Sequence, residues 1–133
     1  FSGGSTFKLA LYNSNATLGK STANYSTNPG GGSNTEVANT GTYVAGGLAL
    51  VKPNPSTSMA SSTAIVDFDN LSFTSVSLTA RGALIYNTTT SGGSGTTDSV
   101  CVLDFGADKT ATSGTFTVQF PAFTTSAAIL RIA

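Results

Sequence analysis

The residues best suited to chemistry in this chain are its few carboxylates, beginning with Asp67 and Asp69, which lie two positions apart in Asp-Phe-Asp-Asn. Carboxylate oxygens at this spacing suit a Ca²⁺ site, which needs about six to eight oxygen ligands. A calcium loop would bring further carboxylates and a glycine in a fixed order, whereas Leu, Ser and Phe follow here. We therefore interpret Asp69 and Asn70 as a turn, since both side chains bond their own backbone.

The other reactive groups do not form a catalytic set. Asp104 and Asp108 show no spacing that defines a glycosidase pair, and no lysine belongs to a Ser-x-x-Lys motif. Cys101 is the single cysteine and the chain has no His to activate it, so we expect it to be a small buried hydrophobe. Glycines 30–32 match a phosphate loop in composition alone, because no Lys-Ser/Thr follows them. We expect no enzymatic activity, no cofactor and no metal ion.

The charge of the chain excludes several classes of partner. Six Lys and Arg balance six Asp and Glu, and charged residues make up 9% of the 133 positions, against about 25% in an average soluble domain. No basic face is available for phosphates, so we expect no nucleic-acid partner. No apolar run approaches the ~18 residues that span a membrane. Such a neutral surface suits life inside an assembly, although solvation by Ser, Thr and Asn alone is the alternative.

Apolar patterns predict short β-strands along the whole chain, and no window shows helical periodicity. Strand-like patterns occupy eight segments, namely residues 6–12, 43–51, 64–68, 71–79, 83–87, 100–103, 115–120 and 127–132. Each of these strands has an apolar face that needs cover. We therefore predict a single all-β domain over residues 1–133, an antiparallel two-sheet β-sandwich of jelly-roll-like or Greek-key type with about eight or nine strands.

Several irregularities are expected between and within these strands. Gly46-Gly47 predict a bulge or bend, and a slip of the apolar phase predicts a second bulge near Thr74-Ser75. A loop rich in Gly, Asp and Thr is expected to join 100–103 to 115–120. Residues 56–62 are expected to form an exposed loop.

Two long polar stretches, residues 13–34 and 88–98, are expected to be surface loops that carry contacts. Leu18 and Tyr25 are the larger apolar residues of the first stretch, and Met59 is the apolar residue of the loop at 56–62. These three residues are our contact-loop candidates.

One ion pair is expected near the core. Arg81 lies between two apolar strands, and a guanidinium in that position needs a carboxylate partner. Asp104, at the end of a neighbouring apolar strand, and Asp67 are the candidate partners. An arginine that stacks on Tyr86 is the alternative.

Five blocks follow one another in a characteristic order. They are Phe-Lys-Leu-Ala-Leu-Tyr at 7–12, Glu-Val and Gly-Thr-Tyr-x-Ala-Gly-Gly within 36–47, Thr-Ala-Arg-Gly-Ala-Leu-Ile-Tyr-Asn at 79–87, Val-Leu-Asp-Phe-Gly-Ala-Asp-Lys-Thr at 102–110, and Gly-x-Phe-Thr-Val-Gln-Phe-Pro at 114–121 with the closing strand Ala-Ile-Leu-Arg-Ile at 128–132. This order resembles a family of small virion structural proteins of tailed bacteriophages, over nearly the whole chain.

The resemblance implies a part of the virion, and within it a capsid decoration, or cement, protein that binds and stabilises the major capsid lattice. Its location would be the capsid surface, and its partners the major capsid protein and copies of itself. A tail, neck or fibre component would use the same scaffold and is the alternative. A carbohydrate-binding, adhesin-like sandwich is a weaker alternative, because it would display aromatic side chains, and this chain has no Trp and four Tyr.

Overall fold

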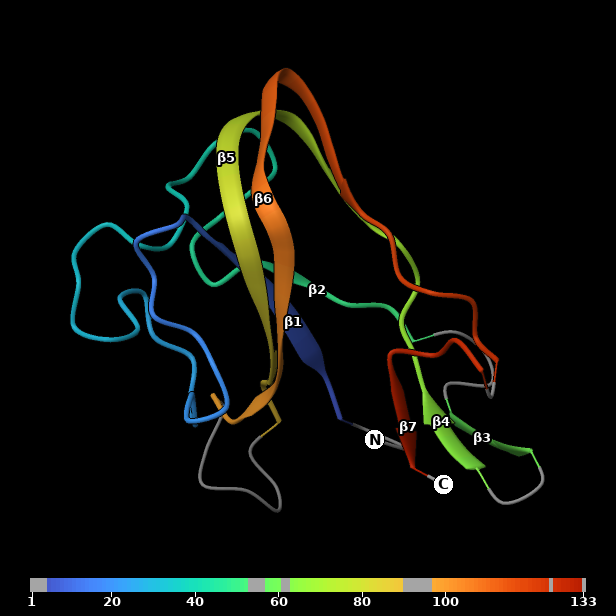
Figure 1. Ribbon diagram of the computed structural model, residues 1–133. Coiled ribbons are helices and arrows are strands. Elements are labelled where there is room, and N and C mark those ends of the chain that lie inside the picture. The colour runs from blue at the N-terminus through green and yellow to red at the C-terminus, as the bar shows by residue number, and fades with distance from the viewer. Residues whose placement is uncertain (1–4, 53–56, 61–62, 90–96, 125, 133) are drawn as a thin grey trace.

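The protein is described by a computed structural model that covers residues 5–52, 57–60, 63–89, 97–124 and 126–132. All regular elements in these ranges are β-strands: β1 (Phe7–Tyr12), β2 (Leu48–Ala49), β3 (Thr57–Ala60), β4 (Thr63–Val66), β5 (Leu71–Asn87), β6 (Ser99–Val118) and β7 (Leu130–Ile132). They form two antiparallel sheets, in the orders β2-β1-β5-β6 and β3-β4-β7 (Figure 1). The all-β, antiparallel prediction is confirmed; the described residues contain fewer strands than expected, and two of them, β5 and β6, are much longer.

Two long strands, β5 and β6, dominate the fold. Figure 1 shows that they rise side by side, bend over together at the top and descend toward β4 and β7. Ser75 and Ser113 have positive φ angles of 55° and 45°, and the pairing of the two strands shifts between Phe73 and Val76. The bulge predicted near Thr74-Ser75 is therefore confirmed, and it lets both strands change direction.

The two interruptions predicted within these strands are wrong. Arg81-Gly82 lies inside β5, and the polar stretch after residue 103 lies inside β6. Both strands continue because each supplies the other with ladder partners, with Gly82 opposite Asp104 and Thr79 opposite Thr110. Residues 105–108 of β6 lie opposite the single residue Arg81, so the polar stretch forms a wide bulge rather than a loop.

The strand predicted at 43–51 is much shorter, since only Leu48–Ala49 pairs, as β2. Gly46 and Gly47 have φ angles of 92° and 75°, which strands do not use. At Gly47 an added Cβ would lie 1.7 Å from the carbonyl oxygen of Leu9. The predicted bend is present, and it ends the ladder.

The second sheet also departs from the prediction. The expected loop at 56–62 contains β3, and β4 pairs with β3 and β7 rather than forming a hairpin with β5. Asp69 is therefore not part of a hairpin turn; its N–H donates to the carbonyl of Val51 at 2.8 Å. The strand predicted at 127–132 pairs only over Leu130–Ile132. Most of the predicted loop at 88–98 lies outside the described residues.

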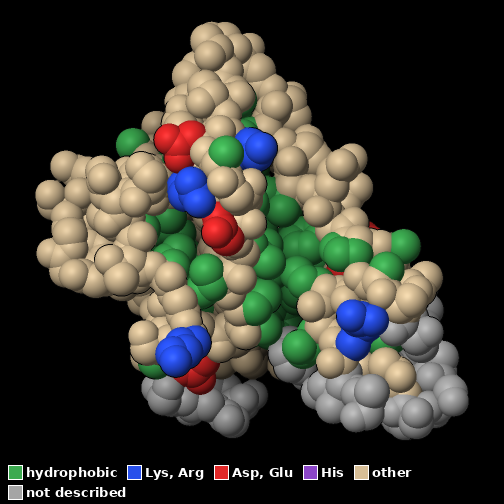
Figure 2. Space-filling model, in the orientation of Figure 1, with side chains coloured by type: hydrophobic (Ala, Val, Ile, Leu, Met, Phe, Trp, Pro, Cys, Tyr) green, Lys and Arg blue, Asp and Glu red, His purple; other side chains and the backbone are tan. Residues whose placement is uncertain are grey.

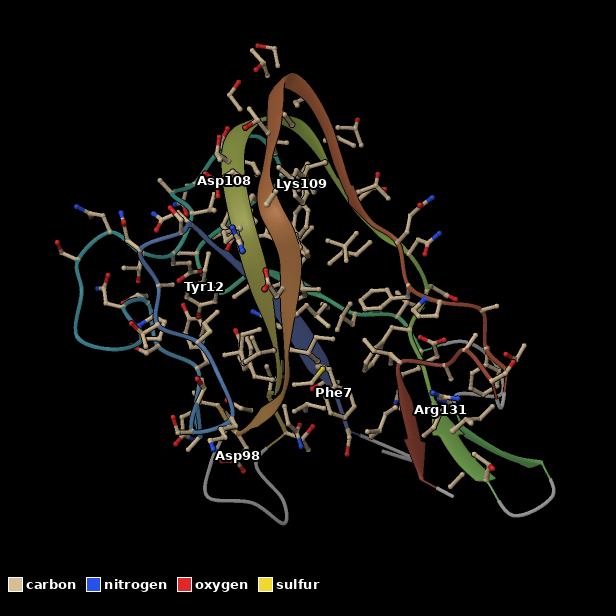
Figure 3. All side chains as sticks on the ribbon, in the orientation of Figure 1. Phe7, Tyr12, Asp98, Asp108, Lys109 and Arg131 are labelled. Atoms are coloured by element: carbon tan, nitrogen blue, oxygen red, sulfur yellow. The ribbon has the colours of Figure 1, made fainter. Side chains whose placement is uncertain are left out.

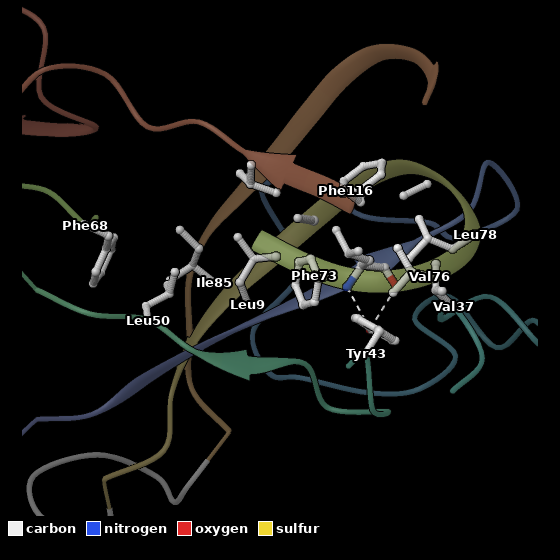
Figure 4. Close-up of a cluster of buried hydrophobic side chains, with 14 of the residues drawn as sticks. Leu9, Val37, Tyr43, Leu50, Phe68, Phe73, Val76, Leu78, Ile85 and Phe116 are labelled. Carbon is white, nitrogen blue, oxygen red and sulfur yellow. Dashed lines mark hydrogen bonds between the residues drawn. The ribbon is translucent and has the colours of Figure 1, made fainter. Parts of the chain in front are cut away.

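Two hydrophobic clusters lie on opposite faces of the β2-β1-β5-β6 sheet, because alternate residues of a strand point to opposite faces. The larger one contains Leu9 and Leu11 of β1 with Phe73 and Val76 of β5, all fully buried (Figure 4). The smaller one is formed by alternate residues of the same two strands, namely Ala10, Tyr12, Leu84 and Tyr86. The first strand is thus confirmed, and beyond the one buried face that its alternation predicted, its second face is buried as well.

Candidate contact surface

Arg81 and Asp104 form an ion pair on the outer part of the sheet. The Arg81 Nε donates to Asp104 Oδ1 at 3.2 Å, with 42% and 69% of the two side chains exposed. The Gly106 N–H donates to the same oxygen at 2.8 Å. This backbone bond and the guanidinium together lower the pKa of Asp104. Of the two carboxylates considered for Arg81, the structure places Asp104 beside it.

Asp67 lies elsewhere, after the end of β4, and is 1% exposed. Its Oδ1 accepts the Phe68 N–H at 2.9 Å, whereas Oδ2 has no hydrogen-bond partner within the described part of the chain. Burial raises the pKa of this carboxyl, and the backbone N–H groups of Phe68 and Ile129 partly offset that effect. Asp69, the other half of the sequence motif, is exposed.

The polar stretch at 13–34 lies along one face of the sheet, on the left of Figure 1. Leu18 and Tyr25 face the sheet rather than solvent, because both pack against the smaller cluster. The Tyr25 ring stacks on Tyr86 with centroids 4.6 Å apart and an interplanar angle of 15°. These two contact-loop candidates therefore anchor the stretch, and its exposed residues are mostly small and polar. Met59, the third candidate, lies in β3, where side chains are outside the described part.

All four tyrosines of the chain gather around one carboxylate, Glu36, which is 9% exposed. Tyr25 donates its hydroxyl to Glu36 Oε2 at 2.8 Å, and Tyr43 donates to Oε1 at 2.9 Å. Tyr12 donates to the Ser26 carbonyl at 2.7 Å, and Tyr86 to the Gly46 carbonyl at 2.6 Å. Figure 3 shows Tyr12 on the side of β1 that faces the 13–34 stretch. We call Tyr12, Tyr25, Tyr43 and Tyr86 the tyrosine cluster.

The tyrosine cluster joins the irregular first third of the chain to the sheet. Glu36 also accepts the Gly46 N–H, so its carboxylate oxygens are satisfied by three groups from two segments, the 13–34 stretch and the loop before β2. Burial raises the pKa of each tyrosine, with Glu36 adding to the effect, and the pKa of Tyr86 rises to about 12. Sequence reasoning missed this site, although Glu36 is the chain's single glutamate and stands seven residues before Tyr43. The available signal was that Glu36 is an isolated acid in a chain with few charged residues, because a carboxylate that is buried needs hydrogen-bond donors around it.

The clearest contact surface is the start of β6, which is an edge strand. We call residues 100–104 the edge segment; its sequence is Val-Cys-Val-Leu-Asp. A segment that is apolar on both faces is typical of a strand covered on both sides. Here it lies at the end of the sheet order, beyond β5, and its four apolar residues are only partly buried.

The apolar surface continues beside the edge segment. Leu103, Phe105, Phe120 and Ile129 pack against the larger cluster and remain partly exposed. Figure 2 shows hydrophobic side chains gathered in the hollow between β6 and the part of the molecule that carries β3, β4 and β7. Several charged side chains lie around this hollow (Figure 2), and Asp108 and Lys109 lie higher on β6, toward the bend (Figure 3).

Cys101 lies in the edge segment and is partly buried. Burial raises the pKa of the Cys101 thiol, so it is a weak nucleophile. Within the described ranges, no group of three or more His, Cys, Asp or Glu is placed to hold a metal ion. The same ranges contain no helix long and apolar enough to cross a membrane. The features that stand out are an open strand edge and a partly exposed apolar hollow.

Comparison with protein-family models, with curated proteins and with solved structures finds no match to this chain.

Proposed function

We propose that this chain is a structural protein of a tailed-phage virion, and specifically a capsid decoration protein that binds the major capsid lattice and stabilises it. The observation that carries the proposal is the partly exposed apolar surface of β6, formed by the edge segment and the neighbouring hollow. Partly exposed apolar side chains that gather on one face of a protein mark contact sites. The order of the sequence blocks supplies the virion context.

The low charge of the chain supports the same proposal. Copies of a decoration protein stand close together on a lattice, so a surface without net charge avoids repulsion between neighbours. Six basic and six acidic residues cancel in this chain. In this proposal the two antiparallel sheets are the layers of the expected jelly-roll-like or Greek-key sandwich, joined by contacts such as Phe7 against Phe68, whose ring centroids are 5.6 Å apart.

The tyrosines bear on the carbohydrate-binding alternative. Tyr12, Tyr43 and Tyr86 are buried, and the Tyr25 ring is stacked on Tyr86. Sugar sites use aromatic rings that a ligand can reach, and the cluster holds these rings inside the molecule. The tail, neck or fibre alternative uses the same apolar surface and differs only in the partner.

Purified particles of a phage whose genome encodes this chain provide the test. We expect mass spectrometry of washed particles to find the protein in many copies, and cryo-electron microscopy to place it on the capsid lattice. Density on the tail, neck or fibres alone would support the structural alternative instead. Absence of the protein from washed particles would overturn every virion assignment.

A binding assay isolates the surface. Recombinant protein added to particles that lack it should bind, and Phe105→Ser should weaken binding roughly ten-fold, as expected for the lost burial of one aromatic side chain. The matched control is Val44→Ser, because Val44 is 53% exposed on the loop before β2, at the opposite end of the sheet. Equal loss with both variants would show that the β6 surface is not the contact.

A further inference from the structure

Among the described residues, no strand pairs with the outer side of the edge segment, which is bounded at both ends. At its start, the Ser99 N–H donates to the Ala23 carbonyl at 2.9 Å, so the edge is already occupied there. At its far end, the wide bulge at 105–108 breaks the regular strand. The pairing also shifts between Ile85 and Tyr86, which leaves Val100 as an extra residue. The regular edge, on which none of the described strands lies, is therefore residues 101–104.

The direction of the backbone groups follows from the ladder. The Asn87 N–H donates to the Asp98 carbonyl, whereas the Thr88 N–H donates to Thr6 on the β1 side. Polar backbone groups alternate in direction along a strand, so those of Ile85 point toward β6 and to its partner Cys101. The N–H and C=O of Val102, one residue further along, therefore point away from β5 to the open edge.

We infer that a second copy of this chain pairs with the edge segment, antiparallel and related by a twofold axis at Val102. A contact between two identical surfaces must be symmetric about its own centre, and Val102 is the outward-pointing residue whose neighbours Cys101 and Leu103 both pair with β5. Antiparallel pairing about Val102 places Cys101 opposite Leu103 of the second copy. The sheets of the two copies then become continuous, and the partly exposed apolar side chains of the two edge segments lie beside one another.

The surroundings of the edge fit this occupant. A hollow of about 600 Å³ lies between the edge segment and the turn at 18–22, and its lining includes Lys20, Val100 and Asp104. Pairing about Val102 brings Asp104 of the second copy to the end of the edge near Val100, which lines the hollow together with Lys20. The symmetry creates this contact twice. Arg81 and Gly106 both donate their hydrogen bonds to Oδ1 of Asp104. Neither of these bonds uses Oδ2 of the same carboxylate.

Neutrality also favours a second copy over a charged partner. The formal net charge of the chain is zero, so two copies approach without long-range repulsion. Exposed edge strands are commonly protected by lysines placed along them, whereas the four residues 100–103 carry no charge. The dimer is a property of the free protein and does not depend on the virion proposal.

Analytical ultracentrifugation over a dilution series of roughly 1 to 100 μM, where weak dimers dissociate, tests the pairing. We expect a monomer–dimer equilibrium, and Val102→Pro should raise the dissociation constant at least ten-fold. Proline removes the outward N–H and leaves the β5 ladder intact, which is the tolerated place for proline in an edge strand. Circular dichroism checks that the variant folds; if it does not, Val102→Lys, which brings two like charges together on the twofold axis, is used instead.

Cysteine cross-linking tests the register. Residues on the twofold axis of an antiparallel pair have Cα atoms about 5.5 Å apart, within disulfide range. Under mild oxidation, Cys101→Ala/Val102→Cys should form a covalent dimer, and Cys101→Ala/Val44→Cys should not, although Val44 is a more exposed position. A monomer at all concentrations, an unchanged dissociation constant in the Val102 variants, or equal cross-linking by the two cysteine variants would overturn the inference.

Discussion

Tyr43 and Glu36 are joined by a hydrogen bond of 2.9 Å at the centre of the molecule. The Tyr43 hydroxyl also accepts the Leu11 N–H at 2.9 Å, as the dashed lines at Tyr43 in Figure 4 indicate. One phenol therefore connects the loop after Glu36 to the middle of β1. Tyr43 is fully buried, so water has no access to replace these bonds.

Replacement of Tyr43 by Phe should lower the free energy of unfolding by about 1 to 3 kcal/mol. The change keeps the ring but leaves the buried Leu11 N–H without its acceptor, and an unsatisfied buried donor costs about that amount. Urea unfolding measures the effect. Tyr25→Phe is the control: Tyr25 is only partly buried and bonds Glu36 alone, so its loss should be smaller. Equal losses would show that the bond to Leu11 contributes nothing.

Alkaline pH should unfold the protein through the tyrosine cluster. The folded state raises the pKa of each tyrosine above the ordinary value of 10.0, to about 12 for Tyr86. The unfolded chain loses phenolic protons above about pH 10 and the folded protein does not, so stability is full below that pH and falls as the pH rises above it. Tyrosinate absorbance and circular dichroism should change together above pH 10. Normal titration of the tyrosines in a protein that stays folded would contradict this prediction.

Asp67→Asn should raise stability at neutral pH, or leave it unchanged, and remove part of its dependence on pH. Burial raises the pKa of Asp67, so its contribution to stability is complete below the unfolded value of about 3.8 and is lost as the pH rises through the folded pKa. Asparagine has no charge to bury and retains an oxygen for the Phe68 N–H. Thermal melting of both proteins between about pH 3 and pH 7 gives the comparison. A clear loss of stability at pH 7 in the variant would show that the charged carboxylate has a favourable partner.

Gly47→Ala should destabilise the protein by ~3 kcal/mol or more, because its Cβ would overlap the Leu9 carbonyl and overpacking adds to the cost of a positive φ angle. Gly31→Ala is the matched control. Gly31 has a φ angle of 81°, and an added Cβ there meets nothing within 4 Å, so only the conformational cost of ~1 to 2 kcal/mol applies. Chemical denaturation separates the two effects. Similar losses at both positions would contradict the close approach between Gly47 and β1.

Local patterns in the sequence were sufficient for several features of the fold. The alternation in residues 7–12 predicted β1, because a strand with a buried face needs an apolar residue at every second position. The phase slip near residue 74 predicted the bulge, since one extra residue reverses the face on which later side chains lie. The glycines at 46–47 predicted a bend for a similarly local reason, the conformational freedom of glycine.

The tertiary structure decided which segments pair, and these choices depend on contacts between distant residues. Polar residues near Asp104 and Lys109 suggest a loop locally, yet β5 supplies ladder partners that keep them in one strand. The 13–34 stretch brings no strand of its own, and its position follows from Tyr25 meeting Glu36 and Tyr86. The apolar pattern at 100–103 predicted a strand that needs cover on both faces. Only the sheet order places it at an edge, because a strand's neighbours are chosen by the whole chain and not by its own sequence.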